Sequence, residues 1–250
     1  MPLIPLELPP GIYRVGTDFE GSNRWRDSNL IRWEDQSMRP VGGWAERDDL
    51  SGDFTAVPRA AHTWVDNSGN GNQAYGSANE LLYVNASGTV YDITPTGFTT
   101  GDEDAAINRG FGGGFFGLGL FGTRRLGANN FQEATTWALD NYGENLVAVA
   151  TSDGKLYEWD LNTAADAVQI ANSPENCKGL VVTEERFIFA LQADGNKRKI
   201  AWCDREDNTL WAPAATNEAG DLEVQTSGEI MCGVRMRGRT LILTNVDAHI

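Results

Sequence analysis

The sequence has few of the residues on which most catalytic and metal sites depend. Its 250 residues include 2 histidines and 3 cysteines. Neither His62 nor His249 lies at a metal-ligand spacing, and Cys177, Cys203 and Cys232 form no CxxC pair. A zinc knuckle or a disulfide framework is therefore not expected. An odd number of thiols is typical of a protein made in a reducing compartment.

Catalytic motifs are also missing. No GxSxG nucleophile elbow occurs, and the glycines at 112–114 are not followed by the GK[ST] of a phosphate loop. The 35 acidic residues would permit a glycosidase carboxylate pair, but so many acids place two together by chance. The acidic stretch 101–104 and the turn 194–196 lack the closing Glu of a calcium loop. We therefore expect no enzyme, no metal and no cofactor.

Positive charge is scarce, with 20 Lys and Arg against 35 Asp and Glu and a formal net charge of −15. A protein without a cationic excess releases few counterions from nucleic acid, so specific binding to phosphates is not expected. The charge is compatible with solubility, or with a wall past which a polyanion slides.

Long apolar runs are absent, because none approaches the roughly 20 residues that span a bilayer. Residues 1–10 are apolar but lack a basic residue, and their prolines would break a signal-peptide helix. We expect an extended N-terminal arm on a soluble protein that is not secreted by this route and does not insert stably into a membrane.

What the sequence has instead is a series of short β-prone runs. Residues 146–150 and 156–159 flank the turn Ser152-Asp153-Gly154. Asp-Gly between two such runs is typical of a hairpin, because glycine takes the positive φ that the turn needs. The same pattern occurs at 81–84 with 90–93 and at 186–191 with 199–204, and residues 240–244 open a fourth unit without a return strand.

Repetition at roughly 40 to 50 residues predicts an all-β fold built from β-propeller blades. A β-sandwich of several hairpins is the alternative. Because the last strand lacks a partner, we expect the propeller to be incomplete or part of a longer chain. The expected organisation is an irregular, extended docking arm over residues 1–50 and blades over residues 51–250.

Two segments stand apart from the blades. Residues 1–50 are dense in Arg and Trp with acidic residues interleaved, which favours docking to protein over binding to nucleic acid. Residues 110–127 hold too many glycines for a regular strand and too many Phe and Leu for a solvated linker, so a contact loop or a disordered insertion is expected. The candidate subunit-contact residues are Arg24, Trp25, Arg26, Arg32, Trp33, Phe111, Phe115, Phe116 and Phe121.

Four tryptophans lie near the ends of the predicted strands: Trp137, Trp159, Trp202 and Trp211. Indole rings can stack on sugars, but in β-rich proteins they more often fill the space between sheets. Core packing is the favoured interpretation, and a glycan platform is the alternative.

Several stretches together resemble a known family. They are residues 9–14, 24–27, 30–33 and 39–44 near the start, 137–147 with 156–159, and 200–204 with Trp211 and 216–222. They are similar to the β-propeller portion of tail nozzle, or packaged-DNA stabilisation, proteins of short-tailed bacteriophages.

The resemblance implies a structural virion protein without catalytic activity, assembled in the host cytoplasm and located in the tail. It implies a ring homo-oligomer, expected to be a hexamer, that docks below the portal and adaptor. Such a ring would line the DNA exit channel and help to retain the packaged genome, which passes without specific binding. A glycan- or receptor-binding propeller of a tail or cell surface is the alternative function, and a polysaccharide-cleaving propeller is a third.

Overall fold

The computed structural model describes residues 11–17, 19–21, 24–35, 37–43, 50–52, 54–105 and 133–250. The chain divides into two compact units, Met1–Asp48 and Asp49–Ile250. Apart from the three-residue 3-10 helix η1 (Ala193–Gly195), all regular structure in the described residues is β-strand. The prediction of an all-β fold is therefore confirmed. No helix in the described residues is long and apolar enough to span a membrane.

The N-terminal unit contains a β-hairpin, a regular element that the expectation of an irregular, extended arm did not include. Strands β1 (Ile31–Glu34) and β2 (Ser37–Pro40) are antiparallel, with Trp33 opposite Met38. Asp35 takes a left-handed φ of 50° in the turn, and the Ser37 hydroxyl donates to the Glu34 carbonyl at 2.9 Å. Aspartate tolerates this conformation better than most residues. The turn therefore forms without the Asn-Gly or Asp-Gly pair that marks a hairpin in a sequence.

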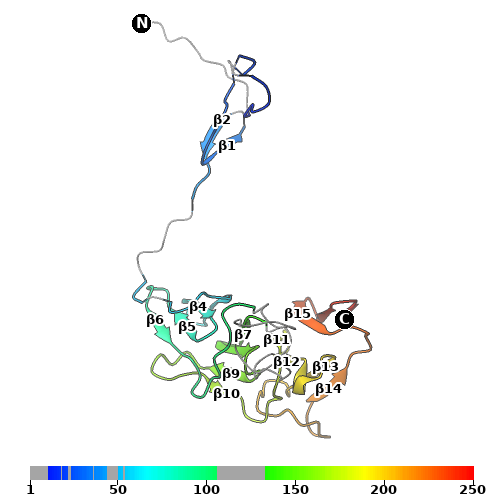
Figure 1. The fold of residues 1–250 in the computed structure, drawn as a ribbon. Helices are drawn as coiled ribbons and strands as arrows, with labels where there is room; N and C mark the ends of the chain where they lie inside the picture. The colour runs from blue at the N-terminus through cyan, green and yellow to red at the C-terminus, as the bar shows by residue number, and fades with distance from the viewer. Residues whose placement is uncertain are drawn as a thin grey trace, which may run out of the picture. The chain divides into compact units, whose positions relative to one another are not determined.

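The second unit consists of four successive antiparallel sheets, in each of which the strands follow one another in chain order (Figure 1). The first sheet contains β3 (Ala60–Val65), β4 (Gly71–Gly76), β5 (Leu81–Val84) and β6 (Val90–Asp92). The second contains β7 (Trp137–Tyr142), β8 (Asn145–Ala150), β9 (Leu156–Trp159) and β10 (Val168–Gln169). The third contains β11 (Gly179–Val182), β12 (Ile188–Leu191), β13 (Lys199–Trp202) and β14 (Gly220–Glu223). The fourth contains β15 (Ile230–Met236), β16 (Arg239–Thr244) and β17 (Ala248–His249).

These sheets are arranged as propeller blades. The first strands are neighbours along the series, since β3 lies beside β7, β7 beside β11, and β11 beside β15. Meandering sheets placed side by side through their first strands are the repeating unit of a β-propeller. A sandwich would instead consist of two sheets packed face to face, whereas the described strands of this unit form four sheets in series.

Each pair of adjacent sheets shares its own hydrophobic core. One cluster lies between the first and second sheets, one between the second and third, and one between the third and fourth. Strand β8 serves two of them, because Val147 and Val149 point into one cluster while Leu146 and Ala148 point into the other. Alternate residues of a strand face opposite sides of the sheet. A strand buried on both faces must therefore be apolar throughout.

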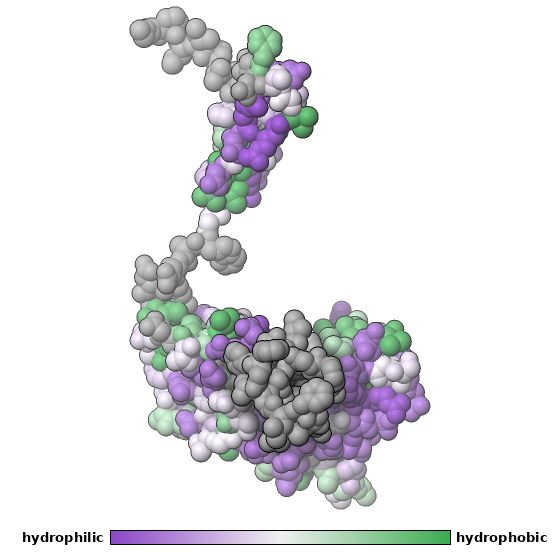
Figure 2. Space-filling view, viewed as in Figure 1, coloured by the Kyte–Doolittle hydropathy of each residue, from purple (hydrophilic) through white to green (hydrophobic). Residues whose placement is uncertain are grey.

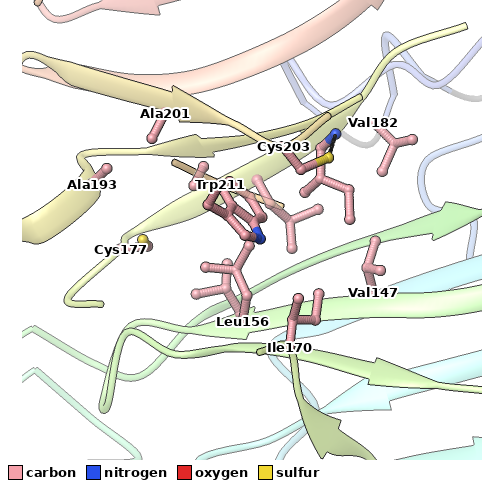
Figure 3. Packing of buried hydrophobic residues seen from close by; sticks show 13 residues of the cluster. Val147, Leu156, Ile170, Cys177, Val182, Ala193, Ala201, Cys203 and Trp211 are labelled. Carbon is pink, nitrogen blue, oxygen red and sulfur yellow. Dashed lines mark hydrogen bonds between the residues drawn. The ribbon is translucent and has the colours of Figure 1, made fainter. Parts of the chain in front are cut away.

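Figure 3 shows the cluster between the second and third sheets. Val147, Leu156 and Ile170 come from the second sheet and its following segment, and they face Val182 and Trp211 of the third-sheet region. All five are at most 7 % exposed.

Polar contacts also join neighbouring sheets. The Trp64 indole donates to the Glu144 carbonyl at 2.9 Å, and the amide of Val182 donates to the Asp140 carboxylate at 2.9 Å. The side-chain amide of Gln192 donates to the Ile230 carbonyl. Each contact joins one sheet to the next, so the series of sheets is laterally braced.

The predicted hairpins form, but they do not occupy equivalent places in the sheets. The runs at 146–150 and 186–191 become the second strands of their sheets, whereas 81–84 becomes a third strand. Residues 240–244 do not open a sheet and do not lack a partner. They lie in β16, which pairs with β15 before it and with β17 after it. Strand β15 escaped prediction because glycine and arginine interrupt its apolar residues.

Candidate functional site

The described residues of the N-terminal unit form almost no core. Gly21 is the only described residue of this unit that is buried. Phe19, Val15 and Leu30 are exposed by 89 %, 78 % and 72 %. A folded segment normally offsets its loss of conformational entropy by burying apolar surface. We therefore infer that contact with another surface would stabilise this unit by burying its exposed apolar side chains.

Two of the predicted contact residues hold the first part of this unit together. Trp25 forms a parallel bridge with Ile12, and its carbonyl accepts a hydrogen bond from the Tyr13 amide at 2.8 Å. The Arg24 guanidinium lies over the Tyr13 ring, 5.6 Å from its centroid. Arg26, the third predicted residue here, lies against Gly21.

The other two predicted residues lie side by side in the hairpin. Arg32 and Trp33 are consecutive in β1, and Arg32 pairs with Glu34 at 3.0 Å. Arg39 of β2 approaches the same carboxylate oxygen at 3.6 Å. Exposed pairs of this kind contribute about 0 to 1 kcal/mol each. Both guanidinium groups are more than half exposed, which leaves donors available to a partner.

The tryptophans of this unit carry unused hydrogen-bond donors. The indole nitrogens of Trp25 and Trp33 are shielded from solvent, and neither donates to any residue in the described ranges. Leaving such a donor unpaired costs about 1 to 3 kcal/mol. The structure thus gathers Arg24, Trp25 and Arg26 around one bridge and Arg32 and Trp33 on one strand.

The four predicted phenylalanines of the Gly-rich segment, Phe111, Phe115, Phe116 and Phe121, lie outside the described residues.

The tryptophans of the blades are structural. Trp137, Trp159 and Trp211 are exposed by 7 %, 1 % and 7 %, and Trp202 is half-buried. Each indole N–H donates to a backbone carbonyl, for example Trp137 to Ser77 and Trp211 to Asn208, both at 2.6 Å. Core packing, the favoured interpretation, describes three of them. None of these three presents the open ring face on which a sugar would stack.

The two histidines sit in structural hydrogen bonds. His62 stacks on Trp64 with ring centroids 5.6 Å apart, and its Nε2 lies 3.3 Å from the Asn141 side-chain oxygen. His249 lies 3.0 Å from the Asp247 carboxylate, which also accepts the Thr244 hydroxyl. A catalytic base must contact its nucleophile, but here histidine and hydroxyl share one carboxylate oxygen. This arrangement closes the turn between β16 and β17.

Burial accounts for the perturbed thiols. It raises the pKa of Cys177 to about 12 and that of Cys203 to about 11. Both therefore stay protonated at neutral pH, and a reactive thiolate is disfavoured. Cys232 is exposed. No cluster of three or more His, Cys, Asp or Glu side chains that would suit a metal ion occurs in the parts of the chain that the structure describes.

An apolar groove runs between the third and fourth sheets. A hollow of about 460 Å³ is lined by Trp202, Leu222, Val224 and Ile242, and a second of about 450 Å³ shares Phe189 with it. A separate polar hollow of about 680 Å³ lies beside Trp211. Its Lys199 is already paired with Asp194 at 2.8 Å and Asp221 at 3.4 Å.

The outward face of the fourth sheet was not predicted from the sequence, because strand β15 was not predicted. The side of the fourth sheet that points away from the third sheet carries Cys232, Val234, Leu241 and Leu243. Val234 is 47 % exposed, and hydrophobic surface is visible at the fourth-sheet end in Figure 2. The alternation of apolar and other residues over 230–236 was the available signal for this strand.

No protein-family model matches the sequence, and no curated protein matches it. Among solved structures, the chain is similar to a crystal structure of virginiamycin B lyase from Staphylococcus aureus, with a TM-score of 0.41 and 9 % sequence identity. The match covers 74 % of this chain and 48 % of that one, so this chain spans about half the length of that structure. A likeness this distant says nothing about activity.

Proposed function

We propose that the chain is a structural subunit of a bacteriophage tail, in which the blades act as a stiff block and the N-terminal unit docks to a neighbouring protein. In its full form the proposal is a nozzle-type ring below the portal and adaptor that lines the DNA exit channel. The resemblance of short stretches near the start, around 137–147 with 156–159, and around 200–204 with 216–222 to tail nozzle proteins motivates this assignment.

The observation that carries the proposal is the unburied N-terminal unit. In its described part, this unit exposes aromatic and aliphatic side chains such as Phe19 and Leu30, and a partner that covered them would stabilise it by removing apolar surface from water. Arginine and tryptophan are enriched in protein–protein interfaces. The net charge of −15 suits a wall that DNA passes, because a negative surface does not hold phosphates.

The test is whether the chain is part of a particle. Tailed particles from the strain that carries the gene are purified, and the chain is sought by mass spectrometry and by antibody labelling in electron micrographs. We expect the chain at the tail in stoichiometric amount. Finding it only in the soluble fraction of lysed cells would refute the proposal.

Variants of the hairpin test the docking element. Trp33→Ala combined with Arg32→Ala removes an indole and a guanidinium from β1 and should reduce incorporation into particles at least about tenfold, as for an interface hot spot. Arg205→Ala is the matched control, because Arg205 lies on the blades and pairs with Glu218 at 3.2 Å. Equal incorporation of both variants would remove the N-terminal unit from the interface.

A glycan-binding role has one observation in its favour, the polar hollow beside Trp211. Amide and carboxylate side chains line it, and sugars are bound through such groups. The Trp211 ring, however, is 7 % exposed and its N–H is already bonded. Glycan-array binding that is lost on Asp221→Ala would favour this second function over the first.

A further inference from the structure

The two end sheets of the blade series differ in what they expose. The middle sheets are covered on both faces, but the first and fourth sheets each have one face that points away from the series. The inward face of the first sheet is identified by Trp64 and His62, which contact Glu144 and Asn141 of the second sheet. Alternate residues therefore point outward.

The outward face of the first sheet is lined by small or polar side chains near the first strand. Ala61, Thr63 and Val65 are all exposed, and Val65 is exposed by 67 %. Further out, Tyr75 is covered by Phe54, with ring centroids 5.2 Å apart. Another sheet can thus approach β3 closely without displacing a large side chain.

The outward face of the fourth sheet is apolar. Gly233 and Ile242 are paired across β15 and β16 and point toward the third sheet, since a Cβ at Gly233 would meet Val181 at 2.8 Å. The neighbouring pairs point the other way: Val234 with Leu241, and Cys232 with Leu243. This face has the composition of the buried sheet faces in the series, but Val234 is 47 % exposed.

The charges of the two end sheets are opposite. Residues 230–250 contain Arg235, Arg237 and Arg239 and the single acid Asp247. Within the described part of the chain, none of these three arginines forms an ion pair. Residues 54–105 carry one base, Arg59, against six acids, which are Asp66, Glu80, Asp92, Asp102, Glu103 and Asp104.

One acid of the first sheet, Asp66, lies at the same end of the series as Arg237 of the fourth sheet. Turns that join first to second strands lie at one end of the series, because the Asn67 amide donates to Glu144 at 3.2 Å and Gly143 lies close to Arg186. The turn at Gly238 lies at the same end of the series, because Gly238 and Glu184 line the same hollow. If a first sheet followed the fourth sheet in the same manner, the turn at Asp66 would face the turn at Arg237.

We propose that the outward face of the fourth sheet binds the outward face of the first sheet of a second copy of this chain. The inference rests on the proposed structural role and names the partner within it. Copies related in this way associate head to tail, which gives a closed ring where the rotation closes and a filament where it does not. Apolar contact at Val234 and Leu241 supplies affinity, and the Arg237–Asp66 turns supply orientation.

The first experiment follows self-association of the full chain by sedimentation velocity over a range of concentrations. We expect reversible association of the native chain. Val234→Asp and Val65→Asp should each weaken association at least about tenfold, because each replaces an apolar side chain of the contact with a charge. Val168→Asp is the matched control, since Val168 is 68 % exposed on β10 and should leave association unchanged.

The second experiment mixes Val234→Asp with Val65→Asp. Each variant keeps one intact face, so the mixture should form a dimer of one copy of each and stop there. Arg237→Glu tests the same contact from an exposed turn that lies outside the apolar face, and it should weaken association and reduce its dependence on salt. Circular dichroism of each variant establishes that the fold is retained.

Two results would overturn the inference. If the native chain stays monomeric at every concentration, the fourth sheet does not bind the first sheet of a second copy. If Val65→Asp associates like the native chain, the contact joins two fourth sheets instead. Neither result bears on the particle test above, because a chain present in tails but monomeric in isolation keeps the proposed function and loses this inference.

Discussion

At the scale of single residues, glycine turns are where sequence and structure agree most closely. The predicted turns at Gly88, Gly154 and Gly195 all have positive φ, at 81°, 67° and 73°. Only glycine adopts this conformation without steric cost. Gly154 has a second requirement, because a Cβ there would lie 2.5 Å from the Asn176 Cα. The hairpin was predictable from the sequence, but this close approach of a distant segment was not.

Gly154→Ala should therefore destabilise the protein more than the same change at a turn glycine with open surroundings. Gly69 is the control, since its φ is +84° and a Cβ there would have no neighbouring atom within 4 Å. We expect Gly69→Ala to cost about 1 kcal/mol from the positive φ alone, and Gly154→Ala to cost about 3 kcal/mol or more from the added clash. Urea unfolding measures both. Equal costs would contradict the close approach.

The thiols give a second residue-scale prediction. With Cys177 and Cys203 buried and Cys232 exposed, a thiol reagent at pH 8 should label one cysteine in the folded protein and three after unfolding. Cys232→Ser should abolish the labelling of the folded protein. Rapid reaction of two or three thiols under native conditions would show that the cores between the sheets are open.

The same burial makes stability depend on pH. The folded pKa values of Cys177 and Cys203, about 12 and about 11, lie above the ordinary value of 9.0. The unfolded chain therefore loses these protons first as the pH rises. Stability from the buried neutral thiols is complete below pH 9 and falls as the pH rises toward 11 to 12. Urea midpoints at pH 8 and pH 10.5 should show a loss, which Cys203→Ala should reduce.

At the scale of elements, a strand that is buried on both faces is the easiest to predict, because its sequence is an unbroken apolar run. Strand β8 reads as an unbroken apolar run because its two faces serve two cores. Strands β3 and β15 belong to end sheets, and their mixed sequences gave no such run. The sequence therefore revealed two strands in each of the first three sheets but none of the first strands, β3, β7, β11 and β15.

The contact between Asp140 and the Val182 amide tests how the sheets are joined. Asp140→Ala removes the acceptor from a donor at the boundary between two sheets and should cost about 1 to 3 kcal/mol. Asp140→Asn keeps a side-chain oxygen and should cost less. Hydrogen exchange at the Val182 amide should accelerate in the alanine variant. An unchanged exchange rate would mean that β11 is held by packing alone.

At the scale of the whole molecule, the two units differ in how much they bury. The cores lie entirely in Asp49–Ile250, whereas Gly21 is the single buried position among the described residues of Met1–Asp48. Stability is then unequal along the chain, since local opening is easiest where few apolar contacts must break.

Limited proteolysis should expose this difference. In the isolated protein, cleavage should begin within Met1–Asp48 and leave the blades intact, and deletion of residues 1–48 should leave the melting temperature of the blades unchanged. Inside an assembled particle, the N-terminal unit should become protected. Resistance of this unit in the isolated protein would show that it is already stably packed without a partner.

The sequence by itself determined that the chain is all-β, where three Gly turns fall and that residues 146–150 form a strand. These features depend on local φ preferences and on the two-residue period of a strand, both of which are written in neighbouring residues. Tertiary structure alone decided which strand begins each sheet, that Thr240 lies in a second strand, and that Val234 points to solvent while Gly233 points inward. The order of the first strands and the inward direction of Gly233 depend on contacts between segments 40 or more residues apart along the chain, where sequence spacing carries no information about distance. Thr240 pairs with the nearby Arg235, but β15 carries no continuous apolar run that would indicate it.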